Sequence, residues 1–369
     1  MPLSFVSKLK NASDVFTFRD FILLPGRSEV EPRDISLNTH LTKKIKLHLP
    51  LVSSPMDTVT EWRMALEMAR LGGVGVIHRN LGIEAQVEQV KKVKASKVKA
   101  KSLDERGAPL VGASISPMDP KRCEALDKVA DFLVADVAHF HNSNVLSAAA
   151  KVIPNLSRDF IAGNIGTRRA VHDIAMELPR VDGFRVGIGS GSVCITSEVT
   201  RVGAPTLFAV AEVSTAANEL NLDVPIMADG GVRGAGDASL AFAAGASTVM
   251  LGSVLAGCEE SPSKVVMRNG KKMKVHRGMA SSAARKARYA LDRYSVPAKG
   301  LDEGVEAYVN YAGNVEEVVE GFANGLRASF GYAGAKSITD LWGVANFGQV
   351  SAVGYTELGV HSLTLKGGG

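Results

Sequence analysis

Short runs of apolar, mostly β-branched residues recur along most of the chain, and each is bounded by Gly, Pro, Asp or Ser. Within a run the apolar positions are consecutive instead of alternating with polar ones, which is typical of parallel strands covered on both faces. We predict eight strands, at Leu49–Ser53, Gly75–His78, Leu110–Ile115, Phe132–Val137, Phe160–Ile165, Phe184–Gly189, Val224–Asp229 and Thr248–Ser253.

The stretches between these runs have the composition and spacing of helices. Trp62–Leu71, Pro205–Leu220 and Asp237–Ala244 are the clearest. A strand followed by a helix, repeated eight times, is the pattern of an α/β protein of the (β/α)8 TIM barrel type. A doubly wound open sheet is the alternative, although such sheets usually have fewer strands. We therefore expect residues 1–369 to form a single barrel domain.

A barrel places its active site at the carboxyl ends of its strands, and there this sequence keeps its unusual residues. Ser54 and Asp57 follow the first predicted strand, Asp136 ends the fourth and Asn164 lies in the fifth. Gly189–Thr196 follows the sixth strand, Asp229-Gly230-Gly231 the seventh and Gly252-Ser253 the eighth. These residues are expected to surround one site.

After the eighth strand the regular pattern stops. Residues 259–304 are polar and basic and show no clear core periodicity. A long irregular segment in a compact domain is usually functional or disordered, so we interpret it as a candidate mobile flap over the active site.

Composition adds few constraints: 46% hydrophobic and 22% charged residues are ordinary for a globular protein. Three widely spaced cysteines argue against a disulfide framework and for a reducing compartment. No secretory signal or membrane-length apolar run is evident, so a cytoplasmic protein is expected. The net charge is +5, much of it in Lys91–Lys101. That run contains no aromatic residue to stack on bases, so we interpret it as a solvated helix end and not as a nucleic-acid surface.

The densest chemical signal is Gly189–Thr196, with the sequence GSGSVCIT. Glycines allow a loop to adopt positive φ and to present consecutive amides to an anion or carbonyls to a cation. A cysteine there, Cys194, is a candidate nucleophile if its thiolate is stabilised. Taken alone, however, such a cysteine is more often inert.

A second signal is a divided phosphate site. Ala228–Val232 and Leu251–Ser253 follow the seventh and eighth strands, the position at which many barrels bind phosphate with a helix N-terminus. Asp229 would repel phosphate, so a sugar hydroxyl is its expected partner. The glycines in both loops are also compatible with tight turns and nothing more.

Together these motifs resemble the IMP dehydrogenase and GMP reductase superfamily, and the resemblance covers nearly the whole chain. The matching segments occur in the family's order. They are Ser53–Glu61 (SSPMDTVTE), Gly75–Asn80 (GVIHRN), Gly189–Thr196, Ala228–Val232 (ADGGV), Met250–Ser253 (MLGS), Arg277–Met279 (RGM), Glu303–Glu306 (EGVE) and Gly359–Leu363 (GVHSL).

The resemblance implies a barrel in which Cys194 adds to carbon 2 of a purine nucleotide and a hydride passes to NAD. Thr196 resembles the threonine beside the reacting centre. The residues resembling the family's site for inosine 5′-monophosphate (IMP) are Ser54, Ser192, Asp229, Gly231, Gly252 and Ser253 for the ribose phosphate, and Met279, Ala280 and Glu303 for the base. Asp136, Asn164 and Arg185 resemble its nicotinamide-riboside contacts.

The family also implies a homotetramer and a monovalent cation, usually potassium. Gly189, Gly191 and Cys194 match the carbonyl ligands of that ion. Glu357 and Gly359 of the partner subunit would complete the cation site.

Within the family, several features distinguish the dehydrogenase from the reductase. The stretch between His78 and Leu110 is too short for the regulatory CBS pair that most dehydrogenases carry there, which favours a reductase. Ser253 in MLGS, Gly300 in place of an arginine, and the GVHSL terminus favour a dehydrogenase. We therefore expect an IMP dehydrogenase without CBS domains. A GMP reductase (GMP and NADPH to IMP and ammonia) and a non-catalytic purine-nucleotide-binding barrel remain alternatives.

A dehydrogenase must also hydrolyse its covalent adduct, which the family does with an Arg-Tyr pair on the flap. Arg293-Tyr294 is the candidate pair, and Arg288-Tyr289 is a second possibility. Other positions depart from the family pattern. His276 replaces a tyrosine and is expected to alter phosphate binding, and Thr206 replaces a glutamine. Phe140 replaces a glycine, and its bulk is expected to change how NAD stacks or whether NAD or NADP is preferred.

Overall fold

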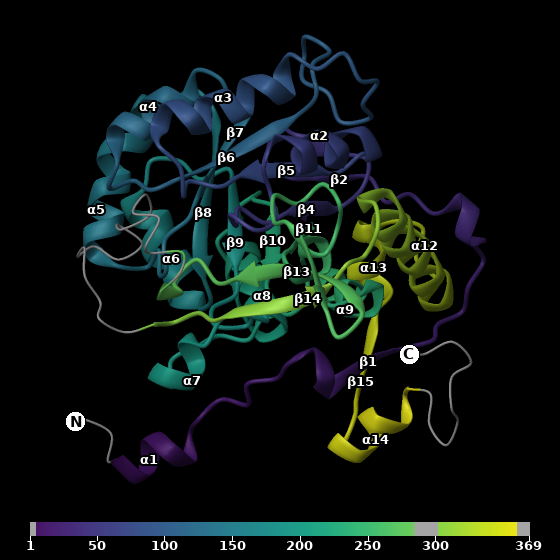
Figure 1. Cartoon of the computed structure of the whole chain (residues 1–369). Helices are drawn as coiled ribbons and strands as arrows, with labels where there is room; N and C mark the ends of the chain where they lie inside the picture. The colour runs from purple at the N-terminus through teal and green to yellow at the C-terminus, as the bar shows by residue number, and fades with distance from the viewer. Residues whose placement is uncertain (1–4, 283, 285–301, 360–369) are drawn as a thin grey trace.

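In the computed structural model, which describes residues 5–282, 284 and 302–359, eight parallel strands form a closed barrel (Figure 1). Every predicted strand is present, shorter by a few residues in most cases. In barrel order they are β4 (Leu51–Ser53), β5 (Val74–Ile77), β6 (Val111–Ile115), β7 (Phe132–Ala135), β8 (Asp159–Ile165), β9 (Gly183–Val186), β10 (Ile226–Asp229) and β11 (Thr248–Leu251). The predicted (β/α)8 architecture is confirmed.

Helices surround the barrel and cover its outer face (Figure 1). The helix predicted at Trp62–Leu71 is α2 with the same bounds, and α8 and α9 lie within two residues of their predicted limits. The main helices are α2 (Trp62–Leu71), α3 (Ile83–Lys94), α4 (Pro120–Asp127), α5 (Ser143–Val152), α6 (Arg168–Glu177), α8 (Thr206–Glu219), α9 (Ala235–Ala243) and α12 (Val315–Ala333). Across the described parts of the chain, none of the helices is both long and apolar enough to span a bilayer.

The strands are buried on both faces because they separate two apolar layers. Val52, Val76 and Met250 belong to the cluster inside the barrel, whereas Leu51 and Ile77 pack outward against the helices. This alternation within continuous apolar runs explains why the sequence showed no polar–apolar periodicity. The core therefore holds the strand ends rigidly where the site is built.

A short hairpin closes the amino end of the barrel. β2 (Thr39–His40) pairs with β3 (Lys46–Leu47), and Leu41 and Leu47 belong to the interior cluster. The Thr42 hydroxyl donates to the buried Asp159 carboxylate at 2.6 Å. With this end filled, the carboxyl end is the open mouth.

The segment after the eighth strand is more ordered than its sequence indicated. β12 (Val265–Arg268) and β13 (Lys271–Arg277) form a hairpin, and β13 pairs with β14 (Glu306–Asn310). The expectation of irregular structure throughout 259–304 is therefore wrong for its first part. The turn residues Asn269 and Gly270 both have positive φ, as a two-residue hairpin turn requires. This Asn-Gly signal was present in the sequence.

A strand from the early part of the chain and one from its late part pair in a separate ribbon beside the barrel (Figure 1). β1 (Phe21–Leu24) pairs antiparallel with β15 (Asn346–Gln349). The following helix, α14 (Ala352–Glu357), contacts the 3-10 turn η1 (Phe18–Asp20).

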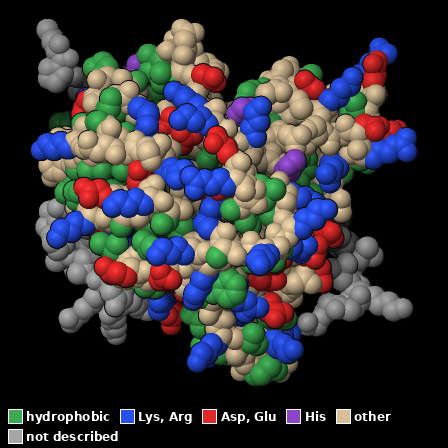
Figure 2. Space-filling model, turned by 90° about the horizontal axis from the view of Figure 1, so that it is seen from above, with side chains coloured by type: hydrophobic (Ala, Val, Ile, Leu, Met, Phe, Trp, Pro, Cys, Tyr) green, Lys and Arg blue, Asp and Glu red, His purple; other side chains and the backbone are tan. Residues whose placement is uncertain are grey.

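The lysine-rich run includes the end of α3, as expected. Lys94 lies between the carboxylates of Asp104 and Asp131, each at 2.8 Å, while Lys91 and Lys92 are exposed. On the face in Figure 2, basic and acidic side chains are interspersed. The view gives no support to a large surface of a single charge.

Candidate active site

A cavity of about 170 Å³ opens at the carboxyl ends of the strands. It lies where the barrel meets β13 and the residues that follow it, 278–280, together called the β13 segment. Every described candidate that the sequence gave for catalysis, substrate or cofactor lines it. These residues are Ser54, Asp136, Asn164, Arg185, Ser192, Cys194, Thr196, Asp229, Gly231, Gly252, Ser253, Met279, Ala280 and Glu303. The cation candidates Gly189 and Gly191 line the same cavity. The structure thus brings together residues from eight separate segments.

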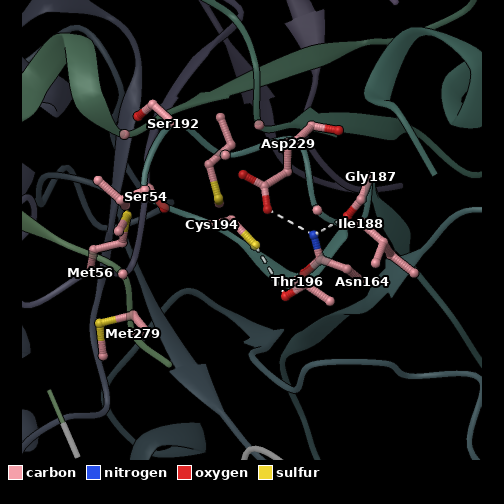
Figure 3. A pocket seen from close by; sticks show the side chains of 18 of the residues that line it. Ser54, Met56, Asn164, Gly187, Ile188, Ser192, Cys194, Thr196, Asp229 and Met279 are labelled. Carbon is pink, nitrogen blue, oxygen red and sulfur yellow. Dashed lines mark hydrogen bonds between the residues drawn. The ribbon is translucent and has the colours of Figure 1, made fainter. Parts of the chain in front are cut away.

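Cys194 lies near the middle of this cavity, with Met56 and Met279 on one side and Asn164 and Asp229 on the other (Figure 3). Its Sγ is 3.2 Å from Thr196 Oγ1, and that hydroxyl donates to Glu303 Oε2 at 3.0 Å. The thiol is thus connected through one hydroxyl to a carboxylate whose residue is only 3% exposed. Such a chain can orient a thiol and relay its proton.

Backbone hydrogen bonds hold Glu303 beside Gly189–Thr196, the cysteine loop. Ile195 N–H donates to Glu303 C=O at 3.0 Å, and Val305 N–H donates to Val193 C=O at 3.0 Å. The loop itself is closed by Cys194 N–H donating to Gly191 C=O at 3.0 Å. The thiol position is therefore determined jointly by the loop after β9 and by residues 303–305, which precede β14 (Glu306–Asn310).

Glycine at 187 is required by both space and conformation. It has φ +125°, and a Cβ there would lie 2.3 Å from the Asp229 carbonyl oxygen. The cysteine loop consequently starts in direct contact with the end of β10.

A chain of alternating charges crosses the mouth of the barrel. Arg185 Nε donates to Asp229 Oδ2 at 2.9 Å, and its Nη1 donates to Asp136 Oδ1 at 3.3 Å. Arg79 donates to the Asp136 carbonyl at 2.8 Å and its Nε lies 3.5 Å from the Asp136 carboxylate. The two carboxylates raise the pKa of the Arg185 guanidinium against the opposing effect of its burial. Arg79, which the sequence had not suggested, therefore supports the Asp136 carboxylate.

Asn164 is positioned by an irregularity between β8 and β9. The register shifts between Gly163 and Ile165, so Asn164 has no paired position in the ladder, and such bulges re-aim side chains. Its Nδ2 donates to Gly187 C=O and to Asp229 Oδ2, both at 2.8 Å (Figure 3). Both donors to the Asp229 carboxylate bind Oδ2, so within the described part of the chain Oδ1 keeps its lone pairs for a ligand hydroxyl.

The part of the cavity lined by glycine turns and serine hydroxyls is suited to an anion. Gly230 and Gly231 both have positive φ, and Gly252 precedes α10 (Ser253–Ala256) as its N-cap residue. Amides of a glycine turn and a hydroxyl at Ser253 therefore line the same wall as Ser54 and Ser192.

His276 extends this wall and was only partly foreseen. Its Nδ1 lies 3.0 Å from Thr58 Oγ1, which also accepts the Arg277 N–H at 3.3 Å. The contact with Thr58 holds the ring through Nδ1, so Nε2 is the ring nitrogen that faces a ligand in this wall. Burial lowers the pKa of His276 to about 4, although the nearby Asp57 opposes this shift. The ring is therefore neutral at pH 7.

Phe140 does not occupy the place expected from its sequence position. Its side chain is fully buried, with its ring centroid 6.0 Å from that of Phe160. The ring is therefore not presented to the cavity, because the chain after Asp136 turns this residue into the layer beneath the helices.

Three groups of candidates are not assembled here. Glu357 ends α14 and Gly359 follows it, and neither lines the cavity of its own chain. Both Arg-Tyr pairs, Arg293-Tyr294 and Arg288-Tyr289, and Val360–Leu363 of the GVHSL motif lie outside the described residues.

Comparison with known proteins gives a consistent picture. Residues 15–361 match the family model described as IMP dehydrogenase / GMP reductase domain. The inosine-5′-monophosphate dehydrogenase of Korarchaeum cryptofilum is 37% identical over 94% of this chain and 96% of its own. That of Cryptosporidium parvum is 37% identical over 96% and 97%, and that of Borreliella burgdorferi 36% over 96% and 98%. The Korarchaeum alignment spans 461 positions, so part of that protein has no counterpart among these 369 residues.

Proposed function

This chain belongs to the IMP dehydrogenase / GMP reductase family, and from that premise we propose that it oxidises IMP to xanthosine 5′-monophosphate with NAD, a step of guanine nucleotide synthesis. The observation that carries the proposal is the position of Cys194 Sγ. It lies in one cavity with an anion-binding wall and is connected to Glu303 through Thr196. The relatives named above, each an inosine-5′-monophosphate dehydrogenase, support the choice of reaction.

The proposed reaction balances as two steps. The Cys194 thiolate forms a bond to carbon 2 of the purine, and the hydrogen on that carbon leaves with its electron pair. NAD, when bound, supplies the acceptor for this hydride. Water then cleaves the carbon–sulfur bond, which gives xanthosine 5′-monophosphate, one proton and the regenerated Cys194 thiolate.

Thr196 and Glu303 have complementary roles in this scheme. The Thr196 hydroxyl can accept the thiol proton while its own hydrogen is directed to Glu303 Oε2 at 3.0 Å. Glu303 also lines the part of the cavity where Met279 and Ala280 enclose the base. A carboxylate there is able to accept a purine N–H.

The 5′-phosphate is assigned to the wall made by Ser54, Ser192, Gly231 and Ser253. His276 joins it as a neutral donor through Nε2, because Thr58 occupies Nδ1. This is our explanation for how a histidine replaces the family's tyrosine. Asp229 Oδ1 is the acceptor for a ribose hydroxyl, as its charge would repel the phosphate.

The cofactor side fits a nicotinamide riboside. Asp136, Asn164 and Arg185 offer carboxylate, amide and guanidinium groups at one side of the thiol, all held by the charged chain described above. Their role is to bind and orient the ring and ribose so that the hydrogen on carbon 2 faces the acceptor.

For the monovalent cation, the carbonyls of Gly189, Gly191 and Cys194 lie in a single loop that the positive φ of Gly189 bends. Loop carbonyls are suitable ligands for potassium, whose bound charge would hold this loop in shape. We propose that Glu357 and Gly359 of the partner subunit complete the site, in a homotetramer of single-domain barrels without CBS domains and with residues 259–304 contributing the flap.

The proposal is tested by absorbance at the NADH wavelength with IMP, NAD and potassium, beside a control with GMP and NADPH. A rise with IMP that Cys194→Ala abolishes is the expected result. Arg293→Ala should stall the enzyme as its covalent adduct, visible as a mass increase on Cys194, while a burst of NADH remains. Consumption of NADPH with GMP would instead identify a reductase, and inactivity in both assays with retained IMP binding would identify a binding protein.

A further inference from the structure

One ion pair joins the two walls of the cavity that carry the purine-binding residues. Arg277, the last residue of β13, donates through Nε and Nη2 to the Asp57 carboxylate at distances of 2.7 to 3.2 Å. Asp57 lies in the loop after β4, and its side chain is 6% exposed against 26% for Arg277. A two-pronged guanidinium–carboxylate contact fixes orientation as well as distance.

The same loop binds the neighbouring residues of the β13 segment. Asn80 Nδ2 donates to Asp57 Oδ2 at 2.7 Å, which holds the carboxylate from the barrel side. The Asp57 N–H donates to Met279 Sδ at 3.5 Å, and Thr58 Oγ1 accepts the Arg277 N–H at 3.3 Å. Residues 277–279 are thus bound at three points to a loop that grows directly from a barrel strand.

On its other side this stretch touches the cysteine loop without spare room. A Cβ at Gly278 would lie 2.8 Å from Val193 C=O and 3.0 Å from Gly304 Cα. Gly278 N–H donates to Val305 C=O at 2.9 Å, and Ala280 C=O accepts the Glu303 N–H at 3.3 Å. A shift of residues 277–280 would therefore be transmitted to the backbone on both sides of Cys194.

We propose that Asp57 is a positioning residue that acts through Arg277 and Met279 to align the purine ring with the Cys194 thiol. It touches no reacting atom itself. The inference rests on the proposed function, since it assigns the Met279 side of the cavity to the base. It extends that function by naming the contact that fixes the position of residues 277–280, which enclose the base, relative to the barrel.

Binding separates this role from a general contribution to stability. In a Cys194→Ala background, Asp57→Asn should weaken IMP binding by about tenfold or more. The reason is that residues 277–279 would shift, and the surface that contacts the base would no longer line up with the rest of the site. Ribose 5-phosphate, which lacks the purine, should lose clearly less affinity than IMP, since Ser192, Gly231 and Ser253, which hold it, belong to other barrel loops. Isothermal titration with each compound measures both, and neither requires turnover, so failure of the dehydrogenase assay would leave this test intact.

With Cys194 present, Asp57→Asn should reduce the kcat for NADH formation by about 10- to 100-fold. Arg277→Lys keeps the charge but not the two-pronged contact, so it should fall between wild type and Asp57→Asn in both readouts. It also carries the test if Asp57→Asn does not fold.

The matched control is Asp104→Asn, which removes the same charge from the partly buried Lys94–Asp104 pair, remote from the cavity. It should lower the melting temperature without changing IMP affinity. Equal losses for IMP and ribose 5-phosphate, unchanged IMP affinity in Asp57→Asn, or the same pattern in the control would each overturn the proposal.

Discussion

At the scale of single residues, the site depends on polar groups whose partners leave one atom available to a ligand. Asp229 uses Oδ2 for Asn164 and Arg185, and His276 uses Nδ1 for Thr58. In both cases the protein contact fixes the orientation of the side chain. Binding then needs little rearrangement of these side chains.

The buried His276 should make stability depend on pH in a definite direction. Its pKa is lowered to about 4 by burial, whereas in the unfolded chain it stays near 6.5. Between pH 6.5 and 4 the unfolded state binds a proton that the folded state does not, so stability falls as the pH falls through this window. Between pH 7 and pH 5 this residue should cost about 2 kcal/mol of unfolding free energy.

The measurement is chemical unfolding of wild type and His276→Gln at both pH values. The variant has no such proton to bind and should lose less stability on acidification, by about that amount. His172→Gln, at an exposed position, controls for the loss of one histidine. Parallel pH dependences for wild type and His276→Gln would contradict the assignment.

The individual site residues were predictable where chemistry follows directly after a strand. Asp136, Asn164 and Cys194 were found in this way, because the carboxyl ends of barrel strands necessarily share one face. Arg79 and the Thr58–His276 contact were not, since they depend on how far a side chain reaches across the mouth. Phe140 was misplaced because the direction of a side chain in a turn cannot be inferred from its neighbours in sequence.

At the scale of elements, β13 and the residues that follow it form one wall of the active site. They do so although they lie outside the strand–helix repeat of the barrel. The strand order and the Asn-Gly turn of this part of the chain form a compact sheet, and the last residues of the β13 segment run into the cavity. The strands were missed because β12 is largely exposed on both faces, so it lacks the apolar run that marks a barrel strand.

Two glycines of this segment should respond differently to the same substitution. Gly278→Ala places a Cβ against Val193 and Gly304, so it should displace the cysteine loop and lower kcat by about tenfold or more. Gly270→Ala has nothing within 4 Å but a φ of +75°; it should cost about 1 kcal/mol of stability. Steady-state kinetics and melting curves distinguish the two effects. A Gly270→Ala enzyme as slow as Gly278→Ala would show that the whole hairpin, and not the contact at 278, controls turnover.

At the scale of the whole molecule, the question is whether one chain makes a complete site. Glu357 lies away from the cavity of its own chain, and the proposal assigns it to the cation site of its neighbour. Cys194→Ala and Glu357→Ala should each be inactive alone. Unfolded, mixed in equal amounts and reassembled, they should recover about a quarter of wild-type activity, because half of the Glu357→Ala subunits then receive an intact neighbour.

The control for this experiment is mixing after folding without exchange of subunits, which should restore nothing. Absence of recovery in reassembled oligomers of normal size would show that Glu357 is not shared between chains. Activity of Glu357→Ala alone would remove it from the cation site altogether.

The ribbon made by β1 and β15 also has a consequence for how the chain is made. Residues 21–24 leave the ribosome long before their strand partners, residues 346–349, have been synthesised. The barrel strands, by contrast, pair mostly with neighbours in sequence. β1 therefore has unpaired edges while the barrel forms beside it. A nascent chain stalled before Asn346 therefore keeps this edge open to chaperones.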